Sequence, residues 1–308
     1  MTELTIVMYH YIRPIVGSEF PSIKGLELEG FKRQLDFLET NYSIVSSEQV
    51  IDKITRNKAL PPKACWLTFD DGYKDHYQYV LPELVNRSLS GAFFPPRVAI
   101  QENEVLDVNS IHHILSCSND INKLVTDLKH LCLQHGMMSE QIQEYYKQYA
   151  VANRFDNSDI IFIKRMLQHV LPDQMRNEIT SILFEKVVGI PKAEFSNRLY
   201  MSVDEVRKLV SSGMYVGSHG SIHCWLDRIN YQKQKVDISS SLEFLEEVGA
   251  PTFNWIMCYP YGAYNDITLS LLRELGASIG ITTEFRNADL EVDHPLTLPR
   301  LDTNDFPQ

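Results

Sequence analysis

The chain has 308 residues, of which 44% are hydrophobic and 22% charged, and its formal net charge is −11. This composition is typical of a soluble globular protein, and the acidic balance argues against a nucleic-acid partner, because phosphate binding needs clustered Lys and Arg. No segment is apolar over the roughly 18 residues of a membrane span, and the start of the chain lacks the basic region of a signal peptide, so we expect a cytoplasmic protein. The five cysteines are scattered without a CxxC pair, which predicts reduced thiols. The sequence leaves open whether the chain forms a homo-oligomer.

Strands and helices alternate in the first third and in the last third of the chain. The continuous apolar run 64–69 is typical of a strand buried on both faces, and residues 202–205 (SVDE) form a capping box that starts a helix. Strand, helix, strand in this order indicates parallel βαβ units. In chain order we predict strands at 5–11, 64–69, 91–94, 214–218, 255–258 and 279–282, and helices at 31–40, 77–89, 202–210, 235–248 and 267–275.

Residues from about 104 to 198 differ from both flanks, because they show helical periodicity and little strand character. We interpret them as an α-helical insertion in a single catalytic domain that spans residues 1–308. The six or seven β/α repeats around the insertion predict an α/β fold with a distorted or incomplete parallel (β/α) barrel, in preference to a doubly wound sheet. In such barrels the chemistry lies at the C-terminal ends of the strands.

Two adjacent carboxylates, Asp70 and Asp71, follow the predicted strand 64–69 in the motif TFDDGY. Each raises the proton affinity of the other unless a cation intervenes. A metal bound by one carboxylate would therefore leave the other free as a base. A solvated loop with an Asp-Gly turn is the alternative interpretation, and this motif alone does not decide between the two.

Two histidines, His219 and His223, follow the predicted strand 214–218 in the motif SHGSIH. Histidines four residues apart can face one centre when the backbone between them turns, and this arrangement is common for zinc. With Asp71 as the third ligand, a position would stay open for water, as in catalytic zinc sites. A coincidental pair is the alternative, which the position of both motifs at strand ends disfavours.

Two further clusters follow predicted strands. In CYPYG, Tyr259, Pro260 and Tyr261 form a rigid turn with aromatic side chains suited to a sugar-sized groove, although such residues more often pack in the core. In LPRLD, Arg300 and Asp302 bring a cation and a carboxylate close to the end of the chain.

TFDDGY, SHGSIH, YPYG and LPRLD, in this order, resemble the successive motifs of the polysaccharide deacetylase family, also called the NodB homology or carbohydrate esterase 4 family. The resemblance covers roughly residues 4–100 and 200–302, and the family fold is a distorted parallel (β/α) barrel. It implies that Asp70 is the catalytic base and that three residues hold a divalent metal, most often zinc. The implied metal ligands are Asp71, His219 and His223.

The resemblance also suggests which residues meet the substrate. We expect the backbone N–H of Tyr73 to donate to the oxyanion of the tetrahedral intermediate. The expected substrate-binding residues are Tyr73, Tyr259, Pro260 and Tyr261.

The chain departs from the family motifs at three places. Gly220 stands where Ser or Thr usually follows the first histidine. Cys258 stands in the place of an arginine, so we expect Arg300 to orient Asp70 instead. The C-terminal Leu-x-His motif, whose histidine is the general acid, has no counterpart after Asp302.

A replacement acid is present at the start of the chain. The residues around His10 (YHY) are similar to the Tyr-His motif of some poly-N-acetylglucosamine deacetylases of the family, whose acid histidine lies there. We therefore expect His10 to be the general acid, held in place by Asp302, with a satisfied histidine at a strand end as the alternative. Weaker competitors lie at the start of the insertion: His112 and His113, with Asp107 beside them.

The leading hypothesis is a metal-dependent N-deacetylase whose substrate is an acetamido sugar, within a surface polysaccharide or its cytoplasmic precursor. Two alternatives stay open. One is a hydrolase of a non-sugar amide on the same scaffold, since fold alone does not fix function. The other is a catalytically silent domain that binds sugar or protein, which the missing arginine and C-terminal histidine suggest and the complete metal triad disfavours.

Overall fold

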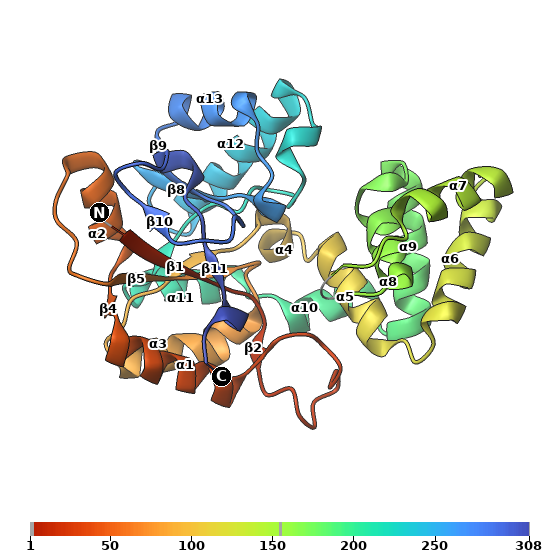
Figure 1. Ribbon diagram of the computed structural model, residues 1–308, viewed down its shortest axis with the longest axis horizontal. Coiled ribbons are helices and arrows are strands. Elements are labelled where there is room, and N and C mark those ends of the chain that lie inside the picture. Colours follow the sequence, from red (N-terminus) through yellow and green to blue (C-terminus); the bar gives the residue numbers. More distant parts are fainter. Residues whose placement is uncertain (1–2, 154–155, 308) are drawn as a thin grey trace. The chain divides into compact units, whose positions relative to one another are not determined.

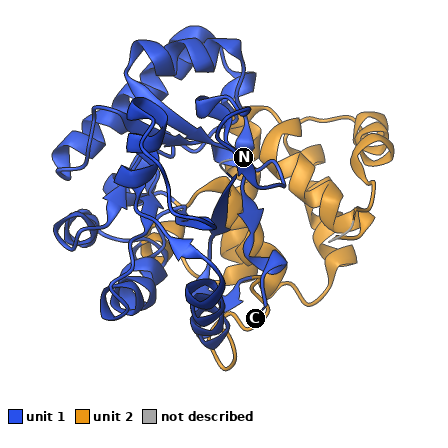
Figure 2. Ribbon diagram, turned by 60° about the vertical axis from the view of Figure 1, so that its left-hand side comes forward, with its two compact units in different colours: residues 1–14, 25–104, 197–308 blue, residues 15–24, 105–196 orange. Residues whose placement is uncertain are grey.

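The computed structural model describes residues 3–153 and 156–307, and the chain forms two compact units (Figure 2). Unit 1 comprises residues 1–14, 25–104 and 197–308, and unit 2 comprises residues 15–24 and 105–196. The second unit therefore contains the helical segment expected at about 104–198, together with a short stretch near the start of the chain that the sequence did not assign to it. That the two units act as one catalytic domain stays a prediction.

Unit 1 is built on parallel strands. β1 (Glu3–Tyr9) pairs in parallel with β5 (Ala64–Asp70), which pairs with β6 (Ala92–Phe94), which pairs with β7 (Tyr215–Val216). All seven residues of β5 are buried, as expected for a strand covered on both faces. This order follows from right-handed βαβ crossovers, which place consecutive strands beside one another.

Beyond β7 the strand order continues through single bridges. Ser218 bridges to Met257 of β8 (Trp255–Cys258), and β8 pairs in parallel with β9 (Ala277–Ile281). Ile281 bridges to Leu298, a few residues before β11 (Leu301–Asp302), which returns in parallel to β1. The strands thus succeed one another in a circuit with two weak junctions. The predicted fold class, an α/β protein with a distorted parallel barrel, is confirmed in this form.

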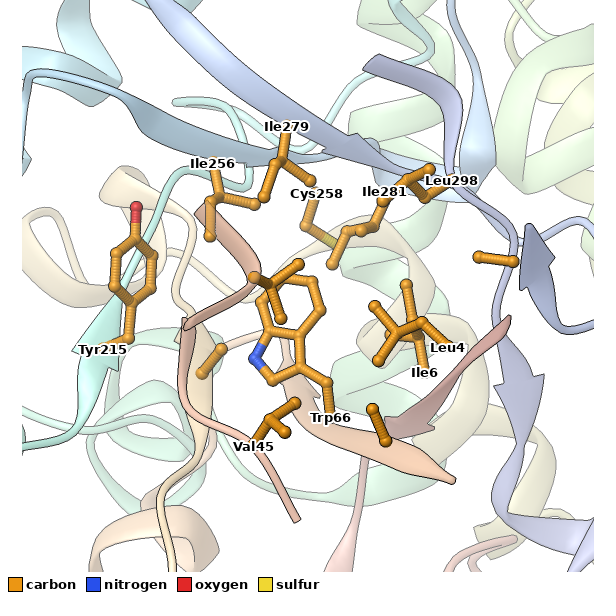
Figure 3. Close-up of a cluster of buried hydrophobic side chains, with 14 of the residues drawn as sticks. Leu4, Ile6, Val45, Trp66, Tyr215, Ile256, Cys258, Ile279, Ile281 and Leu298 are labelled. Carbon is orange, nitrogen blue, oxygen red and sulfur yellow. The ribbon is translucent and has the colours of Figure 1, made fainter. Parts of the chain in front are cut away.

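Alternate residues of these strands face a common apolar core, centred on the indole of Trp66 (Figure 3). The members on β1 and β5 are two residues apart, as the two-residue period of a strand requires. Full burial of one large apolar side chain stabilises the fold by about 1.5–3 kcal/mol. The labelled members are Leu4, Ile6, Val45, Trp66, Tyr215, Ile256, Cys258, Ile279, Ile281 and Leu298.

Helices cover the outside of these strands. The predicted helix after residue 202 is confirmed as α11 (Val203–Ser211), with a complete capping box between Ser202 and Glu205. The predicted helix 77–89 is instead a π-helical turn (His76–Val80) followed by α3 (Leu81–Asn86). The other helices of unit 1 are α1 (Leu28–Asn41), α2 (Ser47–Arg56), α4 (Arg97–Gln101), α12 (Tyr231–Glu247) and α13 (Asp266–Glu274).

Short strands complete unit 1. They were not predicted, because a strand of two residues has no detectable hydrophobic period. They are β2 (Ile12–Arg13), β3 (Leu26–Glu27), β4 (Ser43–Ile44) and β10 (Ala288–Asp289).

Unit 2 is helical wherever it has regular structure among the described residues (Figure 1). None of the helices that the structure describes has both the length and the apolar character needed to cross a membrane. The helices of unit 2 are α5 (Asp107–Cys117), α6 (Ile121–Gln134), α7 (Ser139–Tyr149), α8 (Ser158–Arg165) and α9 (Asp173–Val188), while α10 (Lys192–Leu199) runs across the boundary into unit 1.

Candidate metal-dependent active site

The side chain of Asp70 lies at the carboxyl end of β5, on the strand face that carries Trp66 into the core. A buried arginine meets it there: Nη1 of Arg300 donates to Oδ1 (2.9 Å) and Nη2 donates to Oδ2 (2.8 Å). The same guanidinium donates to Thr68 Oγ1 (3.1 Å) and to the carbonyl of Thr282 (2.8 Å). Arg300, which was expected to orient Asp70, therefore holds it in a bidentate geometry.

The arginine also fixes the charge of Asp70. Burial raises the pKa of this carboxyl, but the Arg300 guanidinium outweighs burial and lowers the pKa to about 2. Asp70 is therefore a carboxylate at neutral pH. Both partners are almost fully buried, so removal of either one would leave an unpaired charge in the core of the site.

Asp71, the next residue, has one oxygen in a hydrogen bond and one oxygen without a hydrogen-bond partner. The hydroxyl of Tyr73 donates to Oδ2 (2.5 Å), whereas Oδ1 accepts no hydrogen bond from any described residue. Burial raises the pKa of Asp71, and the side chains of His219 and His223 outweigh it, so the pKa lies well below its usual range. A cation bound to this buried carboxylate oxygen would stabilise its charge.

The two histidines face that oxygen. Nε2 of His219 lies 3.4 Å from Asp71 Oδ1, and Nε2 of His223 lies 3.3 Å from the same atom. Nδ1 of His219 donates to the carbonyl of Cys258 (2.7 Å). In the neutral imidazole, a proton held at Nδ1 leaves the lone pair of Nε2 toward Asp71, which is how metal-ligating histidines are oriented.

The protonation of the two imidazoles differs. Burial lowers the pKa of His223. Burial also lowers the pKa of His219, but Cys258 and the Asp71 carboxylate outweigh it and hold the pKa well above its usual range. Since a metal needs the neutral imidazole, metal binding at His219 would release a proton.

Two groups of three residues in the described chain could hold a metal ion, with ligand atoms within 4.8 Å of one another: Asp71, His219 and His223, and a second group of Asp70, His219 and Cys258. The second group is a poor metal site, because Arg300 already binds both oxygens of Asp70 and burial raises the pKa of the Cys258 thiol. The first group, with one free carboxylate oxygen and two nitrogens, has the donor set that zinc prefers.

An aromatic pair lies beside His223. Tyr261 stacks on Trp225 with ring centroids 4.4 Å apart and an interplanar angle of 6°, and its edge meets the ring of His223 at 4.8 Å. Both His223 and Tyr261 have a left-handed backbone, with φ of 53° and 58°. A non-glycine residue in this region stores about 1–3 kcal/mol of strain, which indicates that the surrounding contacts hold this corner in place.

His10 also reaches the site. It continues the inward-facing alternation of Leu4 and Ile6 on β1, and its Nε2 lies 3.9 Å from Asp70 Oδ2. The His10 side chain is 40% exposed while that of Asp70 is 2% exposed, so His10 lies between the buried carboxylate and solvent. Its carbonyl accepts a hydrogen bond from His76 Nε2 (2.9 Å), and burial lowers the pKa of His76 to about 4.

Four expected site residues are placed elsewhere or in other roles. Asp302 does not hold His10: as the N-cap of a short helical turn it accepts from the backbone N–H of Asn304 (2.9 Å). Tyr259 is fully buried and donates to the carbonyl of Leu296 (2.7 Å), so it packs in the core. Pro260 is buried beside it.

The side chain of Tyr73 has another role, while the expected role of its backbone N–H stays a prediction. Its ring is fully buried and its hydroxyl donates to Asp71, so the side chain orients one of the candidate metal ligands. Burial raises its pKa well above the usual range, with the Asp71 charge adding to the effect. Of the predicted substrate-binding side chains, Tyr261 is partly exposed and lies beside the candidate metal ligand His223.

The competing acids of the insertion lie in unit 2. Asp107 forms an ion pair with Arg176 (3.3 Å). His113 is fully buried and donates from Nδ1 to the carbonyl of Asn109 (2.9 Å). His112 lies on the same helix, α5.

Four residues that shape the site were not predicted from the sequence: Trp225, His76, Arg97 and Asp237. Asp237 was detectable in principle, because it lies on the buried face of α12 together with Gln234 and Ser241, at helical spacing. A carboxylate on the buried face of a helix needs partners inside the protein.

A comparison with known families supports this geometry. Residues 171–280 match the family model described as Polysaccharide deacetylase. The predicted resemblance to the polysaccharide deacetylase family is confirmed. The matched segment contains the candidate metal ligands His219 and His223 and the YPYG motif, whereas Asp70 and Asp71 lie outside it. No curated protein sequence matches the chain.

Several solved deacetylases share the fold at low identity. The deacetylase PplD of Streptococcus pyogenes, solved in complex with acetate, is 18% identical, with a TM-score of 0.58 over 97% of this chain and 92% of that chain. IcaB from Ammonifex degensii is 18% identical, with a TM-score of 0.55 over 98% of this chain and 91% of that chain. A de-N-acetylase from Aggregatibacter actinomycetemcomitans is 17% identical, with a TM-score of 0.55 over 98% and 95%.

Proposed function

We propose that this protein is a metal-dependent N-deacetylase that removes the acetyl group from an acetamido sugar of a surface polysaccharide or its precursor. One observation carries the proposal. The free oxygen of Asp71 faces the Nε2 atoms of two histidines, at 3.3 and 3.4 Å. Beside it lies Asp70, a second carboxylate that Arg300 keeps ionised.

The residues present fit a divalent metal. Asp71, His219 and His223 would hold it, and the bond from His219 to the Cys258 carbonyl and the bond from Tyr73 to Asp71 would orient two of the three ligands. When bound there, a divalent metal lowers the pKa of water and polarises an acyl oxygen. Zinc is our first choice, because a site with two imidazoles, one carboxylate and an open position is typical of catalytic zinc.

Asp70 is placed to accept a proton. It is ionised at neutral pH, Arg300 holds both oxygens in one orientation, and its neighbour Asp71 is a metal-binding residue. A positioned carboxylate that takes the proton of the attacking water is a general base. The ion pair with Arg300 makes it a weak base, so its orientation contributes more than its basicity.

His10 is placed to return a proton. Deacetylation adds water to the acetamide: the carbonyl carbon gains an oxygen, the carbon–nitrogen bond breaks, and the nitrogen must gain a proton to leave as an amine. His10 is near Asp70 and partly exposed, so it can donate to a leaving group that enters from solvent. His76 fixes the backbone at His10 through its carbonyl.

The aromatic pair favours a sugar over a small non-sugar amide. Trp225 and Tyr261 form a stacked, partly exposed surface next to His223. Ligand sites commonly combine such apolar surfaces with a few oriented polar groups, and the flat apolar face of a pyranose matches an aromatic ring. The related structures named above include a de-N-acetylase and a deacetylase holding acetate, which agrees with this substrate class.

The first test combines metal analysis with turnover. The wild type and His219→Ala are analysed for bound metal after loading with Zn²⁺ and removal of the excess, and both are assayed for acetate and amine release from acetylated glucosamine oligomers. We expect near-stoichiometric metal and acetate release in the wild type, and loss of both in His219→Ala. Metal without release would show that the substrate is another amide. A wild type that binds no metal would refute the mechanism and favour a silent binding domain.

A further inference from the structure

We propose that Asp237 is the positioning residue of the metal-binding histidines, taking over the place of the side chain that polysaccharide deacetylases usually carry at position 220. The inference rests on the proposed function, because it concerns the same metal site. Asp237 comes from helix α12, outside the motifs that carry the family resemblance.

The carboxylate of Asp237 is bonded to the loop between the two histidines. Its Oδ1 accepts the backbone N–H of Ser221 (3.1 Å) and of Ile222 (2.9 Å). Asp237 itself is 4% exposed. These two N–H groups lie midway between His219 and His223, so one oxygen fixes the turn that brings both imidazoles to Asp71.

The second oxygen explains the glycine at position 220. A β-carbon at Gly220 would lie 2.7 Å from Asp237 Oδ2, closer than any ordinary contact, and the backbone there has φ of 70°. A side chain at position 220 would therefore force the Asp237 carboxylate to move. Gly220 departs from the family pattern because the Asp237 carboxylate occupies the space that a side chain at position 220 would need.

The loop is held from its other side as well. Its carbonyl groups accept from the start of α4: the N–H of Val98 donates to the Ser221 carbonyl (3.0 Å), and the N–H of Arg97 donates to the Gly220 carbonyl (3.4 Å). The side chain of Arg97 donates to Ser221 Oγ (2.7 Å). With its carbonyls fixed by α4 and its N–H groups fixed by Asp237, the loop has little freedom to move either histidine.

Two measurements test the inference, on the full chain. Hydrogen exchange of the peptide that covers residues 219–223 reports the two N–H bonds directly, with or without metal. Titration with Co²⁺, followed by its visible absorption spectrum, reports the affinity and geometry of the metal site. We expect Asp237→Ala to lose exchange protection in this peptide, to weaken Co²⁺ binding by about 10–100-fold, and to change the spectrum.

The matched control is Gln234→Ala, one turn earlier on the buried face of α12. Gln234 donates to the Ile229 carbonyl (3.0 Å) and accepts from Thr268 (2.7 Å), and no bond links it to the histidine loop in the described structure. It should lower the melting temperature and leave the Co²⁺ spectrum and affinity unchanged. Asp237→Asn, which keeps an acceptor at Oδ1, should restore most of the affinity and the protection.

Gly220→Ala gives a second variant if Asp237→Ala does not fold, because its β-carbon would meet Asp237 Oδ2. Since alanine is also strained at a φ of 70°, this variant is compared with the double variant Gly220→Ala/Asp237→Asn, and a change in protection between the two reports the carboxylate. Protection and Co²⁺ affinity that stay at wild-type levels in the folded variants, or that fall equally in Gln234→Ala, would overturn the inference. If the wild type itself does not bind Co²⁺, the proposed function fails. The exchange data then decide separately whether Asp237 holds the loop.

Discussion

Two loops carry the candidate metal ligands, one at the carboxyl end of β5 and one after β7, and they are held in different ways. In the first loop, which starts from Asp70 as the last residue of β5, partners bind the side chains: Arg300 binds Asp70 and Tyr73 binds Asp71. In the loop after β7, residues 218–223, partners bind mainly the backbone. The first arrangement sets charge and protonation, and the second sets position. Substitutions in the first loop should therefore impair the site mainly through charge and protonation, and substitutions in the second loop mainly through the position of the histidines.

The largest effects are expected within the first loop, between its adjacent carboxylates. Asp71→Asn removes the charge of a metal-binding residue, so metal content and acetate release should both be lost, because the metal supplies several kcal/mol of transition-state stabilisation. Asp70→Asn should keep the metal and lower turnover by roughly 10²–10⁴-fold, the contribution of a general base. Elemental analysis beside an acetate assay distinguishes them. Equal metal loss in both variants would mean that the two carboxylates do not have separate roles.

Arg300 provides the next test, through stability. Arg300→Met leaves the Asp70 charge buried without its partner, which should lower the free energy of unfolding by about 3–5 kcal/mol. Urea unfolding at neutral pH measures this loss. In the double variant Asp70→Asn/Arg300→Met no charge is stranded, so the loss should be clearly smaller than in Arg300→Met alone. Additive losses would show that the ion pair is not coupled.

The same pair predicts a pH dependence. The folded-state pKa of Asp70 is lowered from 3.8 to about 2, so the folded state binds this proton less readily than the unfolded state. The stabilisation is therefore fully present above about pH 4 and is lost as the pH falls through about 2. The difference in unfolding free energy between wild type and Arg300→Met should shrink over that window. A constant difference down to pH 2 would contradict the assignment.

A smaller effect is expected at Tyr73, whose uncharged hydroxyl positions the candidate metal ligand Asp71. Tyr73→Phe removes the hydroxyl that donates to Asp71 Oδ2 and keeps the buried ring. Loss of such an orienting bond typically weakens metal binding by about 10–100-fold, and Zn²⁺ competition with a chelator measures it. Tyr259→Phe is the matched control, because its buried hydroxyl bonds to the Leu296 carbonyl, away from the metal-binding residues. Equal affinities in the two variants would refute the role of Tyr73.

The strand pattern explains why part of the site could be predicted from the sequence. Asp70 and His219 directly follow apolar runs, and parallel strands bring their carboxyl ends to one rim. The residues that hold the loops were harder to predict from local patterns. Asp237 acts from a helix and was missed. Arg300 was expected to orient Asp70 because of the family resemblance, since no local periodicity encodes a pairing across 230 residues of sequence.

Two further features could not be predicted from the sequence, one in the YPYG motif and one in the helical unit 2. Tyr259 and Tyr261 are two residues apart in one motif, yet one is buried under the Leu296 carbonyl and the other stacks on Trp225. The two side chains differ in environment because the backbone at Tyr261 is left-handed, which the sequence does not reveal. Likewise, residues 15–24 belong to unit 2, although they lie far from its other residues in sequence.

The smallest effect is expected for a substitution of Asp302. It tests whether the ion pair of Asp70 and Arg300 extends to the carboxylate of Asp302. Asp302 lies two residues after Arg300, but its carboxylate caps the turn of residues 303–305 by accepting from the N–H of Asn304. Asp302→Ala should therefore lower the free energy of unfolding by about 1 kcal/mol, as for other lost N-caps, and leave turnover within twofold of wild type. His10→Ala is the contrasting variant: it should lower turnover by roughly 10²-fold or more with little change in stability. If Asp302→Ala instead lowers turnover as much as His10→Ala, the carboxylate of Asp302 assists the general acid His10, and the charged groups of the site extend beyond Arg300.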